Sequence, residues 1–167
     1  MNGIVVAMPE WMMLAVAPFV CTVACGGVIG WREGRLSRTA AVDVGLALGG
    51  ILVIGLNKEV FAPCVRNFIT AYIDHFVTCP AFIAAGNLLL VALRRTPWRS
   101  FGRCVALSLC IGLFLEFAYP HLGLSGHIGG DWFDVAVYVA GGIVLAFVYR
   151  FFATYETRMK KTSKEVG

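Results

Sequence analysis

Three ionisable side chains of this chain are the best placed to do chemistry: His75, Glu116 and Asp134. Each lies close to the end of a long apolar run, where water is still within reach but burial in lipid is costly. An imidazole and two carboxylates can share a proton, hold a polar ligand, or coordinate zinc or manganese. We therefore treat these three residues as the candidate functional cluster.

A second group of polar side chains lies in the connections beside those apolar runs. Its members are Asp74, His121, His127 and Asp131. Loops that face water collect polar residues in any protein, so these four are secondary candidates. Cys64 and Cys79 are both expected on the outer side of the membrane, where a disulfide can persist, so they are a candidate disulfide pair.

Several short motifs of known enzyme mechanisms do not occur in the sequence. It contains no Cys-x-x-Cys, no His-Glu-x-x-His, no phosphate-binding glycine loop and no nucleophile elbow. We therefore predict no cofactor, with a divalent metal at the candidate functional cluster as the alternative. A non-enzymatic role is preferred over an enzymatic one for the same reason.

The composition places these residues in a membrane protein. Hydrophobic residues make up 59% of the chain and charged residues 14%, and the mean hydropathy is +0.78. A soluble domain averages roughly 45–50% apolar and about 25% charged residues. The basic residues lie between the apolar runs, so their positions, and not the net charge of +4, indicate orientation in a membrane, and we expect no nucleic-acid partner.

The apolar runs predict an all-α bundle of about five transmembrane helices. The expected spans are Trp11–Trp31, Ala40–Asn57, Cys79–Leu93, Cys104–Tyr119 and Phe133–Phe152. Residues 1–152 are expected to form a single transmembrane domain, and residues 153–167 a basic cytoplasmic tail. Among the polar residues within the spans, we expect Asp43 at the interface and Asn87 in a hydrogen bond between helices.

The segment Lys58–Thr78 carries a different pattern. Apolar pairs recur every four residues, and polar residues such as Arg66 and Asp74 lie between them. A stripe of this spacing stays on one side of a helix over a few turns. The segment is therefore predicted to be an amphipathic helix that lies in the membrane interface and does not cross it.

Basic residues alternate from one connection to the next. Clusters of arginine and lysine follow the first, third and fifth expected spans, whereas the other connections hold only Lys58 and Arg66. The positive-inside rule then predicts a multi-pass cell-membrane protein with its N-terminus outside and its C-terminus in the cytoplasm. The candidate functional cluster falls on the outer side.

The stretch from Asp74 to about Tyr149 resembles the VanZ-like family of small bacterial membrane proteins. Asp74-His75-Phe76 matches the acid and histidine that open a span in that family, and basic residues follow that span, as in the family. Glu116 matches the glutamate that closes the next span, and Asp134 and Gly141 match the motif of the last helix. The chain departs from the family pattern at three points. Tyr119 replaces a glutamine, Tyr138 replaces an asparagine, and the link Pro120–Trp132 lacks the arginine that the family has there.

The resemblance implies that the glutamate, histidine and aspartate form one shared site. The founding member of the family is associated with low-level resistance to the glycopeptide teicoplanin. Three functions stay open: an envelope protein that binds a lipid-linked or cell-wall ligand at its outer face, a metal-assisted hydrolase of a lipid-linked substrate, and a small proton-coupled transporter or transporter subunit. Membrane lipids are the expected partners, and a homodimer would supply a second half to a transporter.

Overall fold

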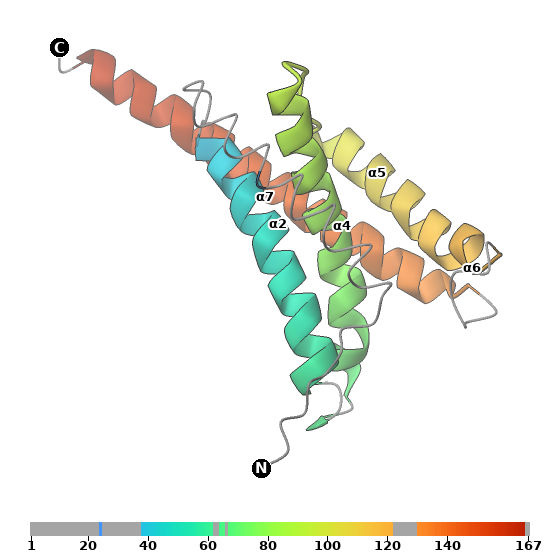
Figure 1. The fold of residues 1–167 in the computed structure, drawn as a ribbon. Helices are drawn as coiled ribbons and strands as arrows, with labels where there is room; N and C mark the ends of the chain where they lie inside the picture. The colour runs from blue at the N-terminus through green and yellow to red at the C-terminus, as the bar shows by residue number, and fades with distance from the viewer. Residues whose placement is uncertain (1–23, 25–37, 62–63, 66, 122–129, 166–167) are drawn as a thin grey trace.

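The computed structural model describes residues 24, 38–61, 64–65, 67–121 and 130–165, and the regular structure of these residues is helical (Figure 1). The long helices are α2 (Arg38–Leu56), α4 (Phe68–Ala92), α5 (Phe101–Leu113) and α7 (Trp132–Glu165). Two π-helical turns, η1 (Asn57–Phe61) and η2 (Phe114–Ala118), prolong α2 and α5, and the short α6 (Tyr119–His121) follows η2.

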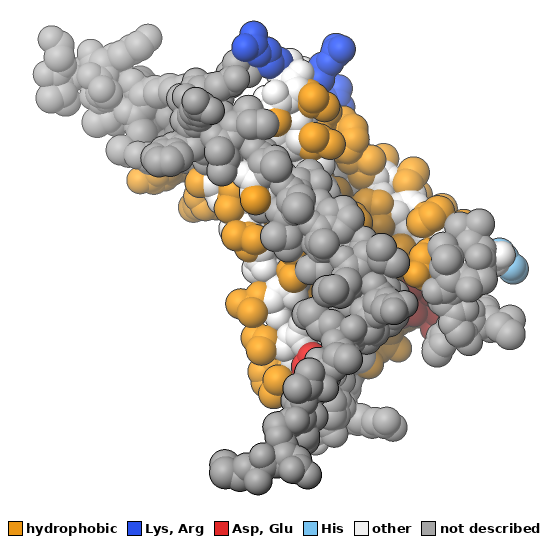
Figure 2. Space-filling view, viewed as in Figure 1, with side chains coloured by type: hydrophobic (Ala, Val, Ile, Leu, Met, Phe, Trp, Pro, Cys, Tyr) orange, Lys and Arg blue, Asp and Glu red, His pale blue; other side chains and the backbone are white. Residues whose placement is uncertain are grey.

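Four helical stretches are long and apolar enough to cross a membrane: Thr39–Phe61, Phe68–Ala92, Phe101–His121 and Trp132–Arg158. Large apolar side chains are exposed along them, among them Leu52, Phe82 and Phe151, and hydrophobic side chains cover much of the described surface that is visible in Figure 2. Such surfaces are stable against lipid and costly in water. The described helices therefore indicate a membrane-spanning protein.

The predicted helix count is not confirmed, because the described residues provide four candidate spans where about five were expected. The first expected span, Trp11–Trp31, lies outside the described residues apart from Ala24. The predicted interfacial helix Lys58–Thr78 is not a separate element. Its first residues end α2 as η1, and its last eleven are the opening turns of α4.

The start of α4 explains this difference. The Asn67 side chain accepts a hydrogen bond from the Thr70 backbone N–H at 2.9 Å, and the Thr70 hydroxyl accepts one from the Asn67 N–H at 3.1 Å. This reciprocal capping satisfies two backbone N–H groups that a helix start leaves free. From there the helix runs without a break through Thr78 and Cys79 to Ala92.

Successive spans run in opposite directions, which gives the bundle two chemically different ends. The basic end holds the connection 93–100 with Arg94, Arg95 and Arg99, and the acidic end holds Glu116 and Asp134. Figure 2 shows lysine and arginine side chains at one end and acidic side chains away from it. α4 packs against both α2 and α7, and α5 packs mainly against α7. α7 continues past Phe152 as far as Glu165, into the predicted tail.

Small residues let these helices approach closely. A Cβ atom at Gly50 of α2 would lie 2.6 Å from the Ala81 Cβ of α4, which is closer than two side chains can pack. Ala47, Ala84 and Leu88 form the buried seam next to this contact. Of the four glycines in the second expected span, Gly50 therefore takes part in helix packing, whereas a Cβ atom at Gly45, Gly49 or Gly55 would meet no atom of another described element within 4 Å.

A proline and a glycine set the crossing of α4 and α7. Pro80 has no N–H, so it cannot donate to the Phe76 carbonyl one turn earlier in α4. Gly141 of α7 packs against that carbonyl, and a Cβ atom at this position would overlap the Phe76 oxygen. Gly142, on the neighbouring face, packs in the same way against Ser108 and the Cys104 carbonyl of α5. The two glycines therefore bring α7 against both of its neighbours.

Candidate functional site

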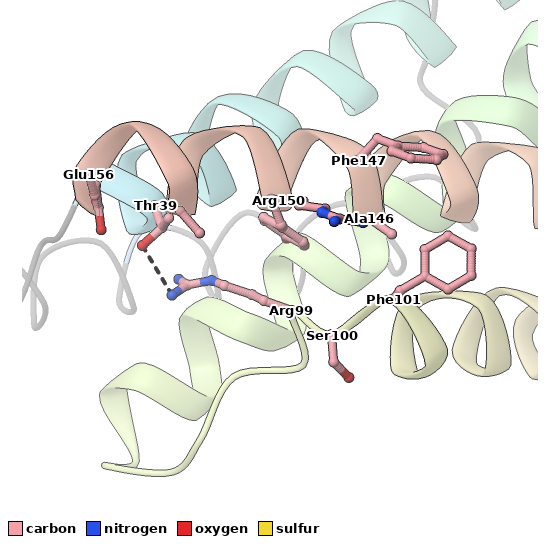
Figure 3. A pocket seen from close by; sticks show the side chains of 10 residues that line it. Thr39, Arg99, Ser100, Phe101, Ala146, Phe147, Arg150 and Glu156 are labelled. Atoms are coloured by element: carbon pink, nitrogen blue, oxygen red, sulfur yellow. Dashed lines mark hydrogen bonds between the residues drawn. The ribbon is translucent and has the colours of Figure 1, made fainter. Parts of the chain in front are cut away.

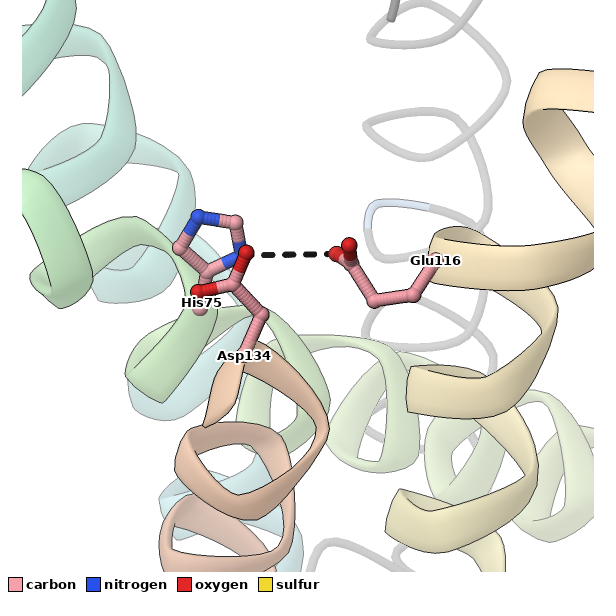
Figure 4. Close-up of side chains that lie close together, drawn as sticks. All are labelled: His75, Glu116 and Asp134. Carbon is pink, nitrogen blue, oxygen red and sulfur yellow. Dashed lines mark ion pairs between the residues drawn. The ribbon is translucent and has the colours of Figure 1, made fainter. Parts of the chain in front are cut away.

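His75, Glu116 and Asp134 converge at the acidic end of the bundle (Figure 4). His75 comes from the first half of α4, Glu116 from η2 and Asp134 from the first turn of α7. One ligand atom from each residue lies within 4.8 Å of the other two. All three side chains are half-buried, so the group is enclosed by helices and still open to a ligand.

Short-range contacts hold the histidine and the glutamate in place. The His75 Nδ1 atom is 3.9 Å from Glu116 Oε1, and a hydrogen bond of 2.8 Å joins it to the hydroxyl of Tyr138. The Asp131 backbone N–H approaches Glu116 Oε2 at 3.5 Å. Tyr138 lies one turn after Asp134 on α7, so both residues present the same helix face to His75.

The π-helical turn η2 positions Glu116. π-helical segments inside α-helices are uncommon and are frequent at functional sites. This one spans Phe114–Ala118, directly after the regular part of α5, and Glu116 is its central residue. Gly130 packs against Phe117 and the Glu116 carbonyl, which brings the entry to α7 beside this turn.

The cluster carries an excess of acidic groups. Among the residues that the structure describes, Glu116 forms its ion pair with His75, and neither Glu116 nor Asp134 is paired with a lysine or arginine. Even a protonated His75 balances only one of the two carboxylates. The arrangement is therefore suited to a proton, a cationic group or a divalent metal.

The secondary candidates lie around this cluster without completing it. Asp74 accepts a hydrogen bond of 2.9 Å from Asn57 and so links α4 to the end of α2. The Asp131 carboxylate accepts from the Phe133 N–H at the start of α7. His121 is exposed at the end of α6, and His127 lies outside the described residues.

The candidate disulfide is wrong, because Cys64 and Cys79 are both free thiols. Cys64 is exposed before the start of α4, whereas Cys79 is fully buried in the middle of that helix. The Cys79 thiol points to α5 and lies 3.7 Å from the Ser108 carbonyl oxygen. The prediction assumed that a span began at Cys79, and the continuous α4 removes that premise.

A second polar group, not predicted from the sequence, lies toward the basic end. Asp43 of α2 is completely buried, and it accepts hydrogen bonds of 2.5 Å from both Arg99 and Tyr149. Arg99 also donates to the Thr39 hydroxyl at 3.2 Å. Asp43 was expected at the interface, and the structure instead makes it the centre of a bonded network.

Asn87 extends this network across the bundle. Its amide donates to the Tyr149 hydroxyl at 3.0 Å, and its carbonyl oxygen accepts from the Trp98 N–H at 2.6 Å. The predicted interhelical role of Asn87 is confirmed by the first of these bonds. The sequence does contain a sign of the Asp43–Arg99 pair. An acid lies near the start of one span and an arginine lies just before another, and charged groups at such positions usually have a partner of opposite charge.

Comparison of the chain with protein-family models, with curated proteins and with solved structures finds no significant match.

Proposed function

We propose that this chain is a membrane protein of the cell envelope that binds a lipid-linked or cell-wall ligand at the His75–Glu116–Asp134 cluster. The observation that carries the proposal is the convergence of an imidazole and two carboxylates from three separate helices. Polar groups inside membrane spans are rare and mark functional sites by default. The excess of carboxylates favours a ligand that brings positive charge with it.

A divalent cation would supply that positive charge and would also bind an anionic group of the ligand. Zinc and manganese accept imidazole and carboxylate ligands, and three protein ligands leave positions open for a phosphate or carboxylate group of the ligand. Ligand atoms on a tetrahedral zinc ion lie roughly 3.4 Å apart at metal–ligand distances of about 2.1 Å. The three ligand atoms lie within 4.8 Å of one another here, so the widest separation would have to contract by about 1.4 Å on metal binding. Such a contraction requires rotation of the three half-buried side chains toward one another.

Titration of the purified full chain with cobalt(II), a spectroscopic probe for zinc sites, tests this proposal. We expect one saturable site in the wild-type protein. The double variant Glu116→Gln, Asp134→Asn should bind cobalt(II) at least about tenfold more weakly, because two ligand carboxylates are lost. Asp131→Asn is the matched control, because its side chain caps α7 and an asparagine caps equally well.

The same variants can be compared in cells. The VanZ-like pattern of the three residues supports a role in teicoplanin-type resistance, so wild-type expression should raise the minimal inhibitory concentration and the double variant should not. A well-expressed double variant with wild-type cobalt binding and wild-type resistance would contradict the proposed site.

A second candidate function is metal-assisted hydrolysis of a lipid-linked substrate. The number of protein ligands favours it, because catalytic zinc sites commonly have three, with water in the remaining position. In this mechanism His75, Glu116 and Asp134 would hold the ion, and the ion would activate a water molecule for attack on the substrate. Metal-dependent release of phosphate from a lipid-linked phosphate by the wild-type protein, and not by the double variant, would distinguish an enzyme from a binding protein.

We further propose that the acidic end faces outward and the C-terminus lies in the cytoplasm, supported by the arginines that gather at the other end. Native Cys64 is exposed at the acidic end and provides a probe. In intact cells a membrane-impermeant maleimide should label Cys64, and it should fail to label a Lys161→Cys variant that lacks Cys64. Labelling at position 161 before the cells are lysed would reverse the orientation.

A further inference from the structure

A pocket of about 650 Å³ opens at the basic end of the bundle, remote from the acidic cluster. It lies where α7 passes the start of α5 and the first residues of α2, and ten residues line it. Pockets that bind small molecules typically measure roughly 300–1,000 Å³. Its place beside the arginine-rich connection 93–100 puts it at the depth of lipid headgroups.

The groups along the pocket follow a definite order. Figure 3 shows Glu156 at one end, Arg99 and Arg150 in the middle, and Phe101 and Phe147 at the other end. The two phenylalanine rings meet edge to face with their centroids 6.0 Å apart, so they form one apolar wall. An acid, a pair of cations and an apolar wall thus succeed one another within a single pocket.

Several hydrogen-bond donors of this pocket have no partner within the described part of the chain. The Arg99 Nε atom is buried and unpaired, although both terminal nitrogens of the same guanidinium are bonded. The Arg150 guanidinium has no ion-pair or side-chain hydrogen-bond partner among the described residues. Ser100 precedes α5 and its side chain makes no capping hydrogen bond. Arg150 and Ser100 are exposed, whereas the Arg99 Nε–H is buried. A buried donor without a partner is costly, so a ligand oxygen beside Arg99 Nε would be stabilising.

The charges of the pocket select among ligands. Asp43 already neutralises Arg99, which leaves Arg150 and Glu156 as the two charges of the lining without an ion-pair partner among the described side chains. A purely anionic headgroup would be repelled by Glu156, and a quaternary ammonium group could not donate a hydrogen bond to it. A phosphate that carries a primary amine matches both charges.

We propose that this pocket binds an aminophospholipid of the phosphatidylethanolamine type. The phosphate lies between Arg150, Ser100 and the Arg99 Nε–H, the ammonium group donates to Glu156, and the acyl chains pass over Phe101 and Phe147. The order amine, phosphate, acyl chain is the order of the lining groups in Figure 3. This site is independent of the acidic cluster and of any ligand bound there.

Lipid binding by the purified full chain in detergent, measured by native mass spectrometry, tests the proposal. The probes are phosphatidylethanolamine, phosphatidylglycerol and phosphatidylcholine with identical acyl chains. Wild-type protein should bind phosphatidylethanolamine at least about fivefold more tightly than the other two, as expected for one charge-assisted hydrogen bond. Glu156→Gln should remove this preference, and Arg150→Gln should weaken the binding of all three lipids.

Arg103→Gln is the matched control, because Arg103 is exposed at the same end of α5 but does not line the pocket. It should leave lipid binding unchanged. A second variant, Ala153→Phe, fills the pocket without changing any charge and should reduce phosphatidylethanolamine binding. Equal binding of the three lipids by wild-type protein, or a preference that survives Glu156→Gln, would overturn the proposal. If Arg103→Gln loses as much lipid binding as Arg150→Gln, exposed arginines attract lipid headgroups without a defined site, and the proposal is overturned as well.

Discussion

An Arg99→Gln variant of the full chain is expected to lose most of its folded population. Asp43 has no exposed surface, and Arg99 is the cation that compensates it, through a hydrogen bond of 2.5 Å. Removing one partner of a buried ion pair leaves the other charge unbalanced and typically lowers the free energy of unfolding by about 3–5 kcal/mol. The midpoint of thermal unfolding in detergent, followed by size-exclusion chromatography, measures the loss.

Two further variants separate the charge from the rest of the side chain. In the double variant Arg99→Gln, Asp43→Asn the buried charge is absent, and a large part of the stability should return. Arg95→Gln removes an exposed arginine of the same connection and should be close to wild type. The interpretation fails if Arg99→Gln is as stable as Arg95→Gln.

Gly141→Ala is expected to be the most disruptive single change that adds only one methyl group. A Cβ atom at Gly141 would overlap the Phe76 carbonyl oxygen, which belongs to the backbone of α4 and cannot rotate away. The two helices would have to separate, and overpacking of this kind costs about 3 kcal/mol. Folded yield and unfolding temperature should both fall, and cobalt(II) binding should weaken in parallel, because Asp134 and His75 lie on either side of this crossing.

Gly102→Ala provides the comparison. Gly102 lies in the first turn of α5, and no atom of a neighbouring residue lies within 4 Å of the place where the alanine methyl group would be, so it meets no obstacle there. Alanine is favoured over glycine in a helix by roughly 1 kcal/mol, so this variant should be neutral or slightly stabilised. Equal stability of the two alanine variants would mean that α4 and α7 do not cross as described.

The positions of α2, α5 and α7 could be predicted from the sequence because each is a long apolar run between charged or turn-forming residues. The proximity of Glu116 and Asp134 followed from the same pattern, since a short link forces two helices to be antiparallel neighbours. His75 joined them because the alternation of spans placed the start of α4 at the same level. Topology alone therefore located the candidate cluster.

The course of the chain before Cys79 could not be predicted in this way. Apolar pairs every four residues describe a helix with one apolar face, and such a helix can lie in the interface or cross the membrane against a partner. The capping residues Asn67 and Thr70 were the local sign that a helix begins there and continues. What decides the outcome is the packing of α4 against α2 and α7, which no local pattern reports.

The network at Asp43 was missed for a related reason. Its bonds join residues 56 and 106 positions apart in the sequence, and each member has an ordinary explanation when it is considered alone. An acid near the start of a span is typical of an interface, and an arginine in a connection is typical of an orientation signal. Only the three-dimensional arrangement shows that the two residues neutralise each other.

Pro80 divides α4 into two parts with separate tasks. The part before the proline carries His75, and the part after it carries Ala81, Ala84 and Leu88, which pack in the buried core. The missing hydrogen bond to the Phe76 carbonyl makes the helix easiest to bend between these parts. Bending at this point would shift the turn that carries His75 relative to the part that packs in the core. One helix therefore carries both a residue of the candidate functional cluster and part of the buried core, on opposite sides of its proline.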